Sequence, residues 1–208
     1  LKNASGGDID LDAIDFCGGV NPSDVTISDA AGLAKWIADD PLEVKKKVGN
    51  FTLTYAEVTA HQMSLFQNVI GEISGTVTWE NLPQAATTEN FFEKIPVRGG
   101  VRLINLPALG NANGLKGYTE IGGDLYIKDC PTLPLCWGPG NCISNVVTVA
   151  GSLTLDNAGW NTNENLQGVA LTALKTVGGD FTIRHDPDQL WNLQNMHLET
   201  DGCHLVLP

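Results

Sequence analysis

The stretch Val177-Gly-Gly-Asp-Phe-Thr-Ile183 decides how this chain is interpreted, because close variants of it recur upstream. Ile121 to Ile127 reads Ile-Gly-Gly-Asp-Leu-Tyr-Ile, and Val149 to Leu155 reads Val-Ala-Gly-Ser-Leu-Thr-Leu. A single copy of such a glycine-rich phrase could be a phosphate-binding loop. A phrase that returns every 24 to 28 residues instead predicts a repeat architecture of stacked units.

Each repeat carries two apolar residues that are separated by one other residue. The first series is Val25, Phe51, Val77, Val101, Leu125, Leu153, Phe181 and Leu205, and the second is Ile27, Leu53, Trp79, Leu103, Ile127, Leu155, Ile183 and Leu207. All of these positions are apolar, although only 42% of the chain is. Alternation with a period of two predicts a strand with one buried face. The residues between each pair are therefore expected on a solvated face; they are Thr26, Thr52, Thr78, Arg102, Tyr126, Thr154 and Thr182.

Both ends of each predicted strand repeat as well. Two residues before the strand stands a glycine at 49, 75, 99, 123, 151 and 179, which indicates a corner with positive φ or a close backbone approach. After the strand stand Asp29, Asn81, Asn105, Asp129, Asn157 and His185, residue types that favour Asx turns. Upstream of the glycines, Ile73, Val97, Ile121, Val149 and Val177 are expected to point inward.

The segments between strands differ in character. Residues 33–48, although interrupted by Pro41, and residues 55–73 are predicted to be helical, with Lys45 to Lys47 as a solvated helix end. Residues 131–142 hold too much Pro, Gly and Cys for a helix. The pattern predicts a β-solenoid of about eight coils of 24–28 residues. A parallel sheet would form one side, and short helices or irregular returns the other. Residues 21–208 are expected to form one domain, preceded by a leader or cap over 1–20.

Charge and hydropathy exclude some partners. The formal net charge of −12 argues against a nucleic-acid or anionic-membrane partner, since both need clustered positive charge. No run of eighteen apolar residues is present, so no membrane span is expected. An acidic surface is compatible with a cation or a neutral glycan as ligand. No motif calls for a cofactor.

Two clusters could bind metal, each with a simpler structural interpretation. The cysteine count is odd: Cys17, Cys130, Cys136, Cys142 and Cys203. A disulfide within the 130–142 loop and buried free thiols are both open. Zinc on the three loop cysteines, with His185 or Asp129 as fourth ligand, lacks the usual CxxC spacing. Asp8, Asp10, Asp12 and Asp15 could attract calcium, but the pattern better fits an edge strand or acidic linker. We expect no metal site.

Catalytic signals are weak. His185 and Asp186 could act as a general base, but His185 occupies a turn position filled elsewhere by Asn or Asp. No G-x-S-x-G elbow or H-E-x-x-H motif accompanies it. A β-helix polysaccharide lyase or hydrolase would need carboxylates that converge across adjacent coils, for which Asp129, Asp156 and Asp180 are the candidates.

Five residues are candidates for ligand contact. Arg102, Tyr126 and Lys128 are predicted on the exposed sheet face, where a solenoid presents an extended surface. Trp137 and Trp160 fall in loops rich in Gly and Asn, where an aromatic ring can stack on a ligand or fold back onto the chain.

Ile121 to Ile127 followed by Asp129-Cys-Pro-Thr-Leu133, together with Leu171-x-x-Leu174-x-x-Val177-Gly-Gly-Asp-Phe-Thr-Ile183, resembles the receptor L domain. That family is a right-handed, leucine-rich-repeat-like solenoid of growth-factor receptors, and similar repeats occur in surface proteins of gut Bacteroidetes. The resemblance implies an extracytoplasmic location, on a bacterial cell surface or secreted, and carries over no catalytic residue.

We therefore expect a non-enzymatic binding or adhesion module for a protein or glycan, with any lipid anchor outside this sequence. The alternatives are a carbohydrate-active β-helix enzyme and a structural spacer.

Overall fold

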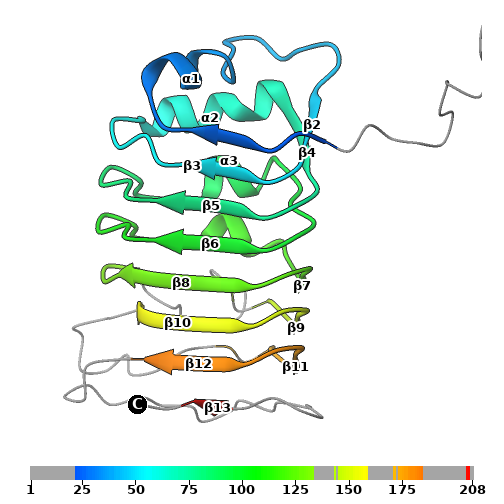
Figure 1. The fold of residues 1–208 in the computed structure, drawn as a ribbon, viewed down its shortest axis with the longest axis vertical. Coiled ribbons are helices and arrows are strands. Elements are labelled where there is room, and N and C mark those ends of the chain that lie inside the picture. The colour runs from blue at the N-terminus through cyan, green and yellow to red at the C-terminus, as the bar shows by residue number, and fades with distance from the viewer. Residues whose placement is uncertain are drawn as a thin grey trace, which may run out of the picture.

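The computed structural model describes residues 22–133, 143, 145–158, 171 and 173–184, and the backbone of Leu205–Val206. One parallel sheet runs the length of the molecule (Figure 1). Its strands, in spatial order, are β1 (Val25–Ile27), β3 (Phe51–Leu53), β5 (Val77–Glu80), β6 (Val101–Ile104), β8 (Leu125–Cys130), β10 (Leu153–Ala158), β12 (Phe181–Arg184) and β13 (Leu205–Val206). Spatial order follows chain order, so each strand pairs with the strand of the next repeat.

The register predicted from the repeat is confirmed. Val101 pairs with Leu125, Leu125 with Leu153, and Leu153 with Phe181. The same alignment holds from Val25 to Val101 at one end and from Phe181 to Leu205 at the other. Equivalent side chains of successive repeats therefore form straight rows across the sheet, about 4.8 Å apart.

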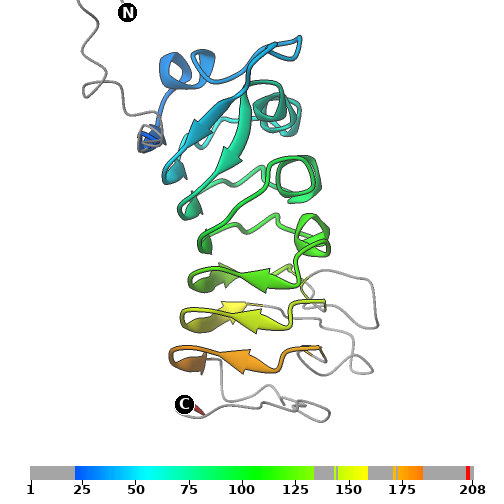
Figure 2. The ribbon, with the colours of Figure 1, turned by 90° about the vertical axis from the view of Figure 1, so that its right-hand side faces the viewer.

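The inward rows form the core. Every described member of the two apolar series is buried, including Trp79, which is fully buried in register with them. The residues expected upstream of the glycines are buried too, and they lie on or beside a second set of short parallel strands. These strands are β2 (Lys46–Val48), β4 (Ile70–Ile73), β7 (Glu120–Ile121), β9 (Thr148–Val149) and β11 (Thr176–Val177). Figure 2 shows the main sheet along one side and the helices α2 (Ala60–Val69) and α3 (Glu89–Phe92) along the other.

The helices are shorter than expected. They are α1 (Ala30–Ala34), α2 (Ala60–Val69), α3 (Glu89–Phe92) and the 3-10 turn η1 (Asn113–Leu115). The prediction for 55–73 is confirmed in part by α2, which begins at a capping box: the Gln62 amide donates to Thr59 Oγ1 and the Thr59 amide to Gln62 Oε1.

The predicted helix over 33–48 is wrong, because only its first two residues fall in α1. Pro41 cannot continue a helix. The buried side chain of Asn68, on α2, also donates to the carbonyls of Ala38 and Asp39, and the Leu42 amide donates to the Asn68 carbonyl. These bonds hold the segment as an irregular loop. Lys45 to Lys47 are exposed, but Lys46 and Lys47 begin strand β2 and are not a helix end.

The glycine corners are close approaches of backbone to backbone. None of the six glycines has a φ in the left-handed region. Of the two predicted reasons for glycine, positive φ and close backbone approach, only the close approach therefore applies. A Cβ on Gly99 would lie 2.5 Å from the carbonyl carbon of Gly75 in the preceding repeat. The Gly99 amide donates to the Gly75 carbonyl, and Gly75 to Gly49 in the same way. Side chains larger than hydrogen would separate the repeats at this row.

Positive φ instead occurs where the strands end. Asn81, Asn105, Asp129 and Asn157 have φ values of 58°, 51°, 51° and 48°, as Asn and Asp tolerate more readily than other residues. Their side chains also bridge repeats: Asn105 Nδ2 donates to Asn81 Oδ1 at 2.7 Å, and Asn157 Nδ2 to Asp129 Oδ1 at 2.8 Å. The predicted turn residues thus stabilise the turn and the stacking together.

Candidate functional site

The solvent-facing side of the main sheet presents two rows of side chains between and after the inward pairs. The first row consists of Thr26, Thr52, Thr78, Arg102, Tyr126, Thr154 and Thr182, and the second of Ser28, Thr54, Glu80, Ile104, Lys128, Asp156 and Arg184. Most of these side chains are exposed or half-buried. Thr182 departs from the expected solvated position, since only 9% of it is exposed. We call these two rows the sheet face.

Arg102 and Tyr126 are in contact at the centre of the sheet face. They pair across β6 and β8, and the Arg102 guanidinium carbon lies 4.5 Å from the centroid of the Tyr126 ring. This is a cation–π geometry, which also holds the long arginine side chain in place. Within the part of the chain that the structure describes, no carboxylate forms an ion pair with Arg102. Its donors remain available to a ligand.

Lys128 belongs to a charge cluster beside that pair. Lys128 Nζ lies 3.4 Å from Asp156 Oδ2, and Arg184 Nη1 lies 4.0 Å from the same oxygen. The charge of Asp156 and its hydrogen bond raise the pKa of Lys128. Asp156 is the most protected of the three, with 18% of its side chain exposed against 39% for Lys128 and 61% for Arg184. The two cations thus extend into solvent around one shared carboxylate.

The three candidate catalytic carboxylates do not meet in one place. Asp180 immediately precedes β12, at the amino end of its strand, whereas Asp129 and Asp156 lie near the carboxyl ends of β8 and β10. At about 3.3 Å per residue, four residues of strand separate the Asp156 row from the Asp180 row by roughly 13 Å. Asp129 accepts a hydrogen bond from Asn157, and Asp156 is paired as described above.

Cys130 is a free thiol in the core. Its Sγ lies 3.3 Å from the Lys128 carbonyl, and burial raises the pKa of the thiol to about 11. The sequence left two alternatives open for Cys130, a loop disulfide and a buried free thiol, and the structure has the buried free thiol. Across the described residues, no group of three or more His, Cys, Asp or Glu side chains is placed to hold a metal ion.

Several other predictions lie outside the described residues. These concern Trp137 and Trp160 as stacking residues, Cys17, Cys136, Cys142 and Cys203 as thiols or ligands, His185 and Asp186 as a possible base, and the acidic cluster from Asp8 to Asp15. Of the site residues predicted from sequence, Arg102, Tyr126 and Lys128 are brought together on one face.

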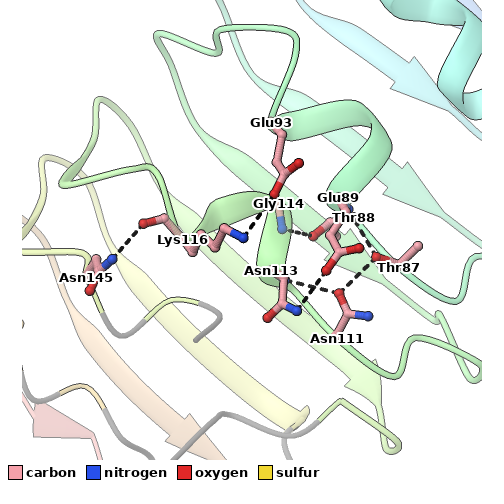
Figure 3. A network of polar contacts seen from close by, with 9 residues as sticks. All are labelled: Thr87, Thr88, Glu89, Glu93, Asn111, Asn113, Gly114, Lys116 and Asn145. Atoms are coloured by element: carbon pink, nitrogen blue, oxygen red, sulfur yellow. Dashed lines mark hydrogen bonds and ion pairs between the residues drawn. The ribbon is translucent and has the colours of Figure 1, made fainter. Parts of the chain in front are cut away.

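A polar network on the opposite side of the molecule was not predicted (Figure 3). The Thr87 hydroxyl donates to Asn111 Oδ1 at 2.9 Å, and Asn113 Nδ2 donates to Glu89 Oε1 at 2.8 Å. The Gly114 amide donates to Thr88 Oγ1 at 3.0 Å, which ties η1 to the start of α3. The residues of the first two pairs are 24 positions apart, which equals the local repeat length. This spacing was the feature of the sequence from which the contacts could have been predicted.

The network continues beside a shallow cleft of about 660 Å³. Lys116 forms an ion pair with Glu93 at 3.3 Å, and its carbonyl accepts from Asn145 Nδ2 (Figure 3). Tyr118, which also lines the cleft, accepts from the Val97 amide and contacts the carbonyls of Phe92 and Ile95 through its hydroxyl. These polar groups satisfy one another, so they explain how the returns stack.

No family model, curated protein or solved structure matches this chain. The described part contains no helix long and apolar enough to cross a membrane. What the structure establishes is therefore a β-rich protein with a mostly parallel sheet and few helices, whose solvent-facing side brings Arg102, Tyr126 and Lys128 together.

Proposed function

We propose that this chain is a non-enzymatic binding module that presents the sheet face to a protein or glycan at a cell surface or in secreted form. We also infer that its repeats are coils of a right-handed solenoid similar to the receptor L domain. One strand per repeat, parallel pairing and stacked inward rows support the solenoid. The location follows from the resemblance of the repeat alone.

The contact of Arg102 with Tyr126 carries the functional proposal. Arginine and tyrosine are among the residues that dominate binding energy at interfaces. Here the ring fixes the guanidinium on a long, regular face, and no described carboxylate neutralises it. An arginine that served only to stabilise the surface would be expected to have such a partner, as Arg98 has in Glu72 at 3.0 Å.

Binding to glycan and protein arrays tests this function. We expect retention of at least one ligand class by the wild-type protein, and loss of that binding in Arg102→Ala and Tyr126→Ala. An unchanged signal in both variants would exclude the sheet face. A silent array would support a structural spacer, and release of reducing sugar ends from a polysaccharide would support the enzyme alternative.

A further inference from the structure

The charge of the sheet face differs from that of the protein. The chain as a whole has a formal net charge of −12. On the two rows of the face, three cations, Arg102, Lys128 and Arg184, stand against two acids, Glu80 and Asp156. Asp156 is shared by Lys128 and Arg184, whereas Arg102 has no ion-pair partner among the described residues. On these two rows, strands β6 to β12 therefore carry three cations against one acid, with Asp129 next to Lys128 just outside the rows.

The remaining side chains of the face are mostly hydroxyl-bearing. Thr78 and Thr154 are half-buried and lie on strands next to those of Arg102 and Lys128, whereas Thr52 and Thr54 lie farther along the face on β3. Ile104 is the aliphatic side chain of the two rows. Threonine is under-represented at protein–protein hot spots, where tryptophan, tyrosine and arginine are enriched. A face of hydroxyls and cations around one aromatic ring suits a polyhydroxylated anionic ligand better than a protein.

The cations also have a useful spacing. Arg102, Lys128 and Arg184 lie on β6, β8 and β12, and β10 between them supplies Asp156. With strands about 4.8 Å apart, the two arginines are separated by roughly 14 Å across the sheet. That span can accommodate an extended polymer lying across the strands. The carboxylates of Asp124 and Asp180 border the face at the amino ends of the strands, and that of Asp129 borders it at the carboxyl end of β8.

We propose that the sheet face binds an anionic polysaccharide that crosses strands β6 to β12, with its carboxylate or sulfate groups on Arg102, Lys128 and Arg184. This inference rests on the proposed function and names its ligand class. The stacked guanidinium of Arg102 presents paired N–H donors, a geometry that matches carboxylate and other oxyanions. The hydroxyl of Thr154 and the side chain of Tyr126 contact the sugar rings.

Two pairs of probes test the ligand class: polygalacturonate against its methyl ester, and dextran sulfate against dextran. Each pair keeps the sugar backbone and changes the charge. We expect the protein to bind at least one charged member, with binding weakened at least about tenfold when the charge is absent. The pair that responds distinguishes carboxylate from sulfate. Added salt should weaken the same binding, because the ion pairs are exposed.

Arg102→Gln is the variant to compare, and Arg98→Gln is its matched control. Both remove one positive charge, but Arg98 lies away from the sheet face and pairs with Glu72. We expect about tenfold weaker binding of the charged probe in Arg102→Gln and little change in Arg98→Gln. Equal effects of the two variants, equal binding of charged and uncharged probes, or no binding of either charged probe would each overturn the inference. A neutral glycan or protein captured on the array and lost in Arg102→Ala would also overturn it, while leaving the proposed function intact.

Discussion

The guanidinium of Arg102 lies 4.5 Å from the centre of the Tyr126 ring, one strand away in exact register. The contact joins two residues that the repeat alone places side by side. It fixes a charged side chain that has no ion-pair partner in the described part of the chain. The function proposed for the sheet face depends on this contact being formed before any ligand arrives.

The Arg102–Tyr126 contact should therefore be measurable in the free protein. A double-mutant cycle of Arg102→Ala, Tyr126→Ala and the double variant, followed by urea unfolding, should give a coupling energy of about 0.5–1 kcal/mol. Additive effects of the two substitutions would show that the ring does not hold the guanidinium in solution.

The glycine corner should be intolerant of side chains. Gly99→Ala should lower the free energy of unfolding by roughly 2 kcal/mol or more, because the new Cβ would meet the Gly75 backbone. Gly117→Ala is the matched control, since a Cβ there meets nothing within 4 Å, and a change within about 0.5 kcal/mol is expected. Similar losses in the two variants, measured by chemical denaturation, would contradict the close-approach explanation.

Stability should depend on pH through Glu72. Its carboxylate accepts from Lys47 at 2.8 Å and from Arg98 at 3.0 Å, and these hydrogen bonds, that of Lys47 first, lower the pKa of Glu72 from its ordinary value of 4.5. A lowered pKa in the folded state adds stability above pH 4.5, which is lost as the pH falls through the folded value.

Glu72→Gln provides the measurement. We expect the variant to be less stable than wild type at pH 7 by under about 1 kcal/mol, because the pair is partly exposed. The difference should close as unfolding is followed down to acid pH. A difference that stays constant with pH would mean that the charge of Glu72 contributes nothing.

The thiol of Cys130 should be unreactive in the folded protein. Burial excludes reagents, and a pKa of about 11 leaves almost no thiolate at neutral pH. Iodoacetamide labelling followed by peptide mass spectrometry should show Cys130 unmodified in buffer and modified in denaturant. Rapid labelling in buffer, or a disulfide-linked Cys130 peptide, would contradict the buried free thiol.

The main sheet could be predicted from the sequence because its information is local and repeated. A period of two within each strand and a nearly constant spacing between strands fix both the face and the register, as the pairing of Val101 with Leu125 shows. The glycine row was predicted with two possible reasons. The choice between positive φ and close backbone approach depends on how the neighbouring repeat is placed, and only the position of Gly75 against Gly99 in the structure decides it.

The returns were harder to predict because distant residues determine them. The conformation of residues 38–42 is set by hydrogen bonds with Asn68, which lies about one repeat further along the chain. No local sequence pattern predicts those bonds. The network around Thr88 and Gly114 has the same character. At the candidate site, the sequence placed Arg102 beside Tyr126, but the stacking of the guanidinium on the ring depends on side-chain conformations that periodicity does not specify.

The most direct test of the central claim is the dissociation constant of the ligand retained on the arrays. It should be measured by calorimetry for wild type, for the double variant Arg102→Gln/Tyr126→Ala and for the control Arg98→Gln. Wild type and control should agree within about twofold, and the double variant should bind at least tenfold more weakly, as expected for loss of a central charged contact. A double variant that binds as tightly as wild type would show that the sheet face is not the binding surface.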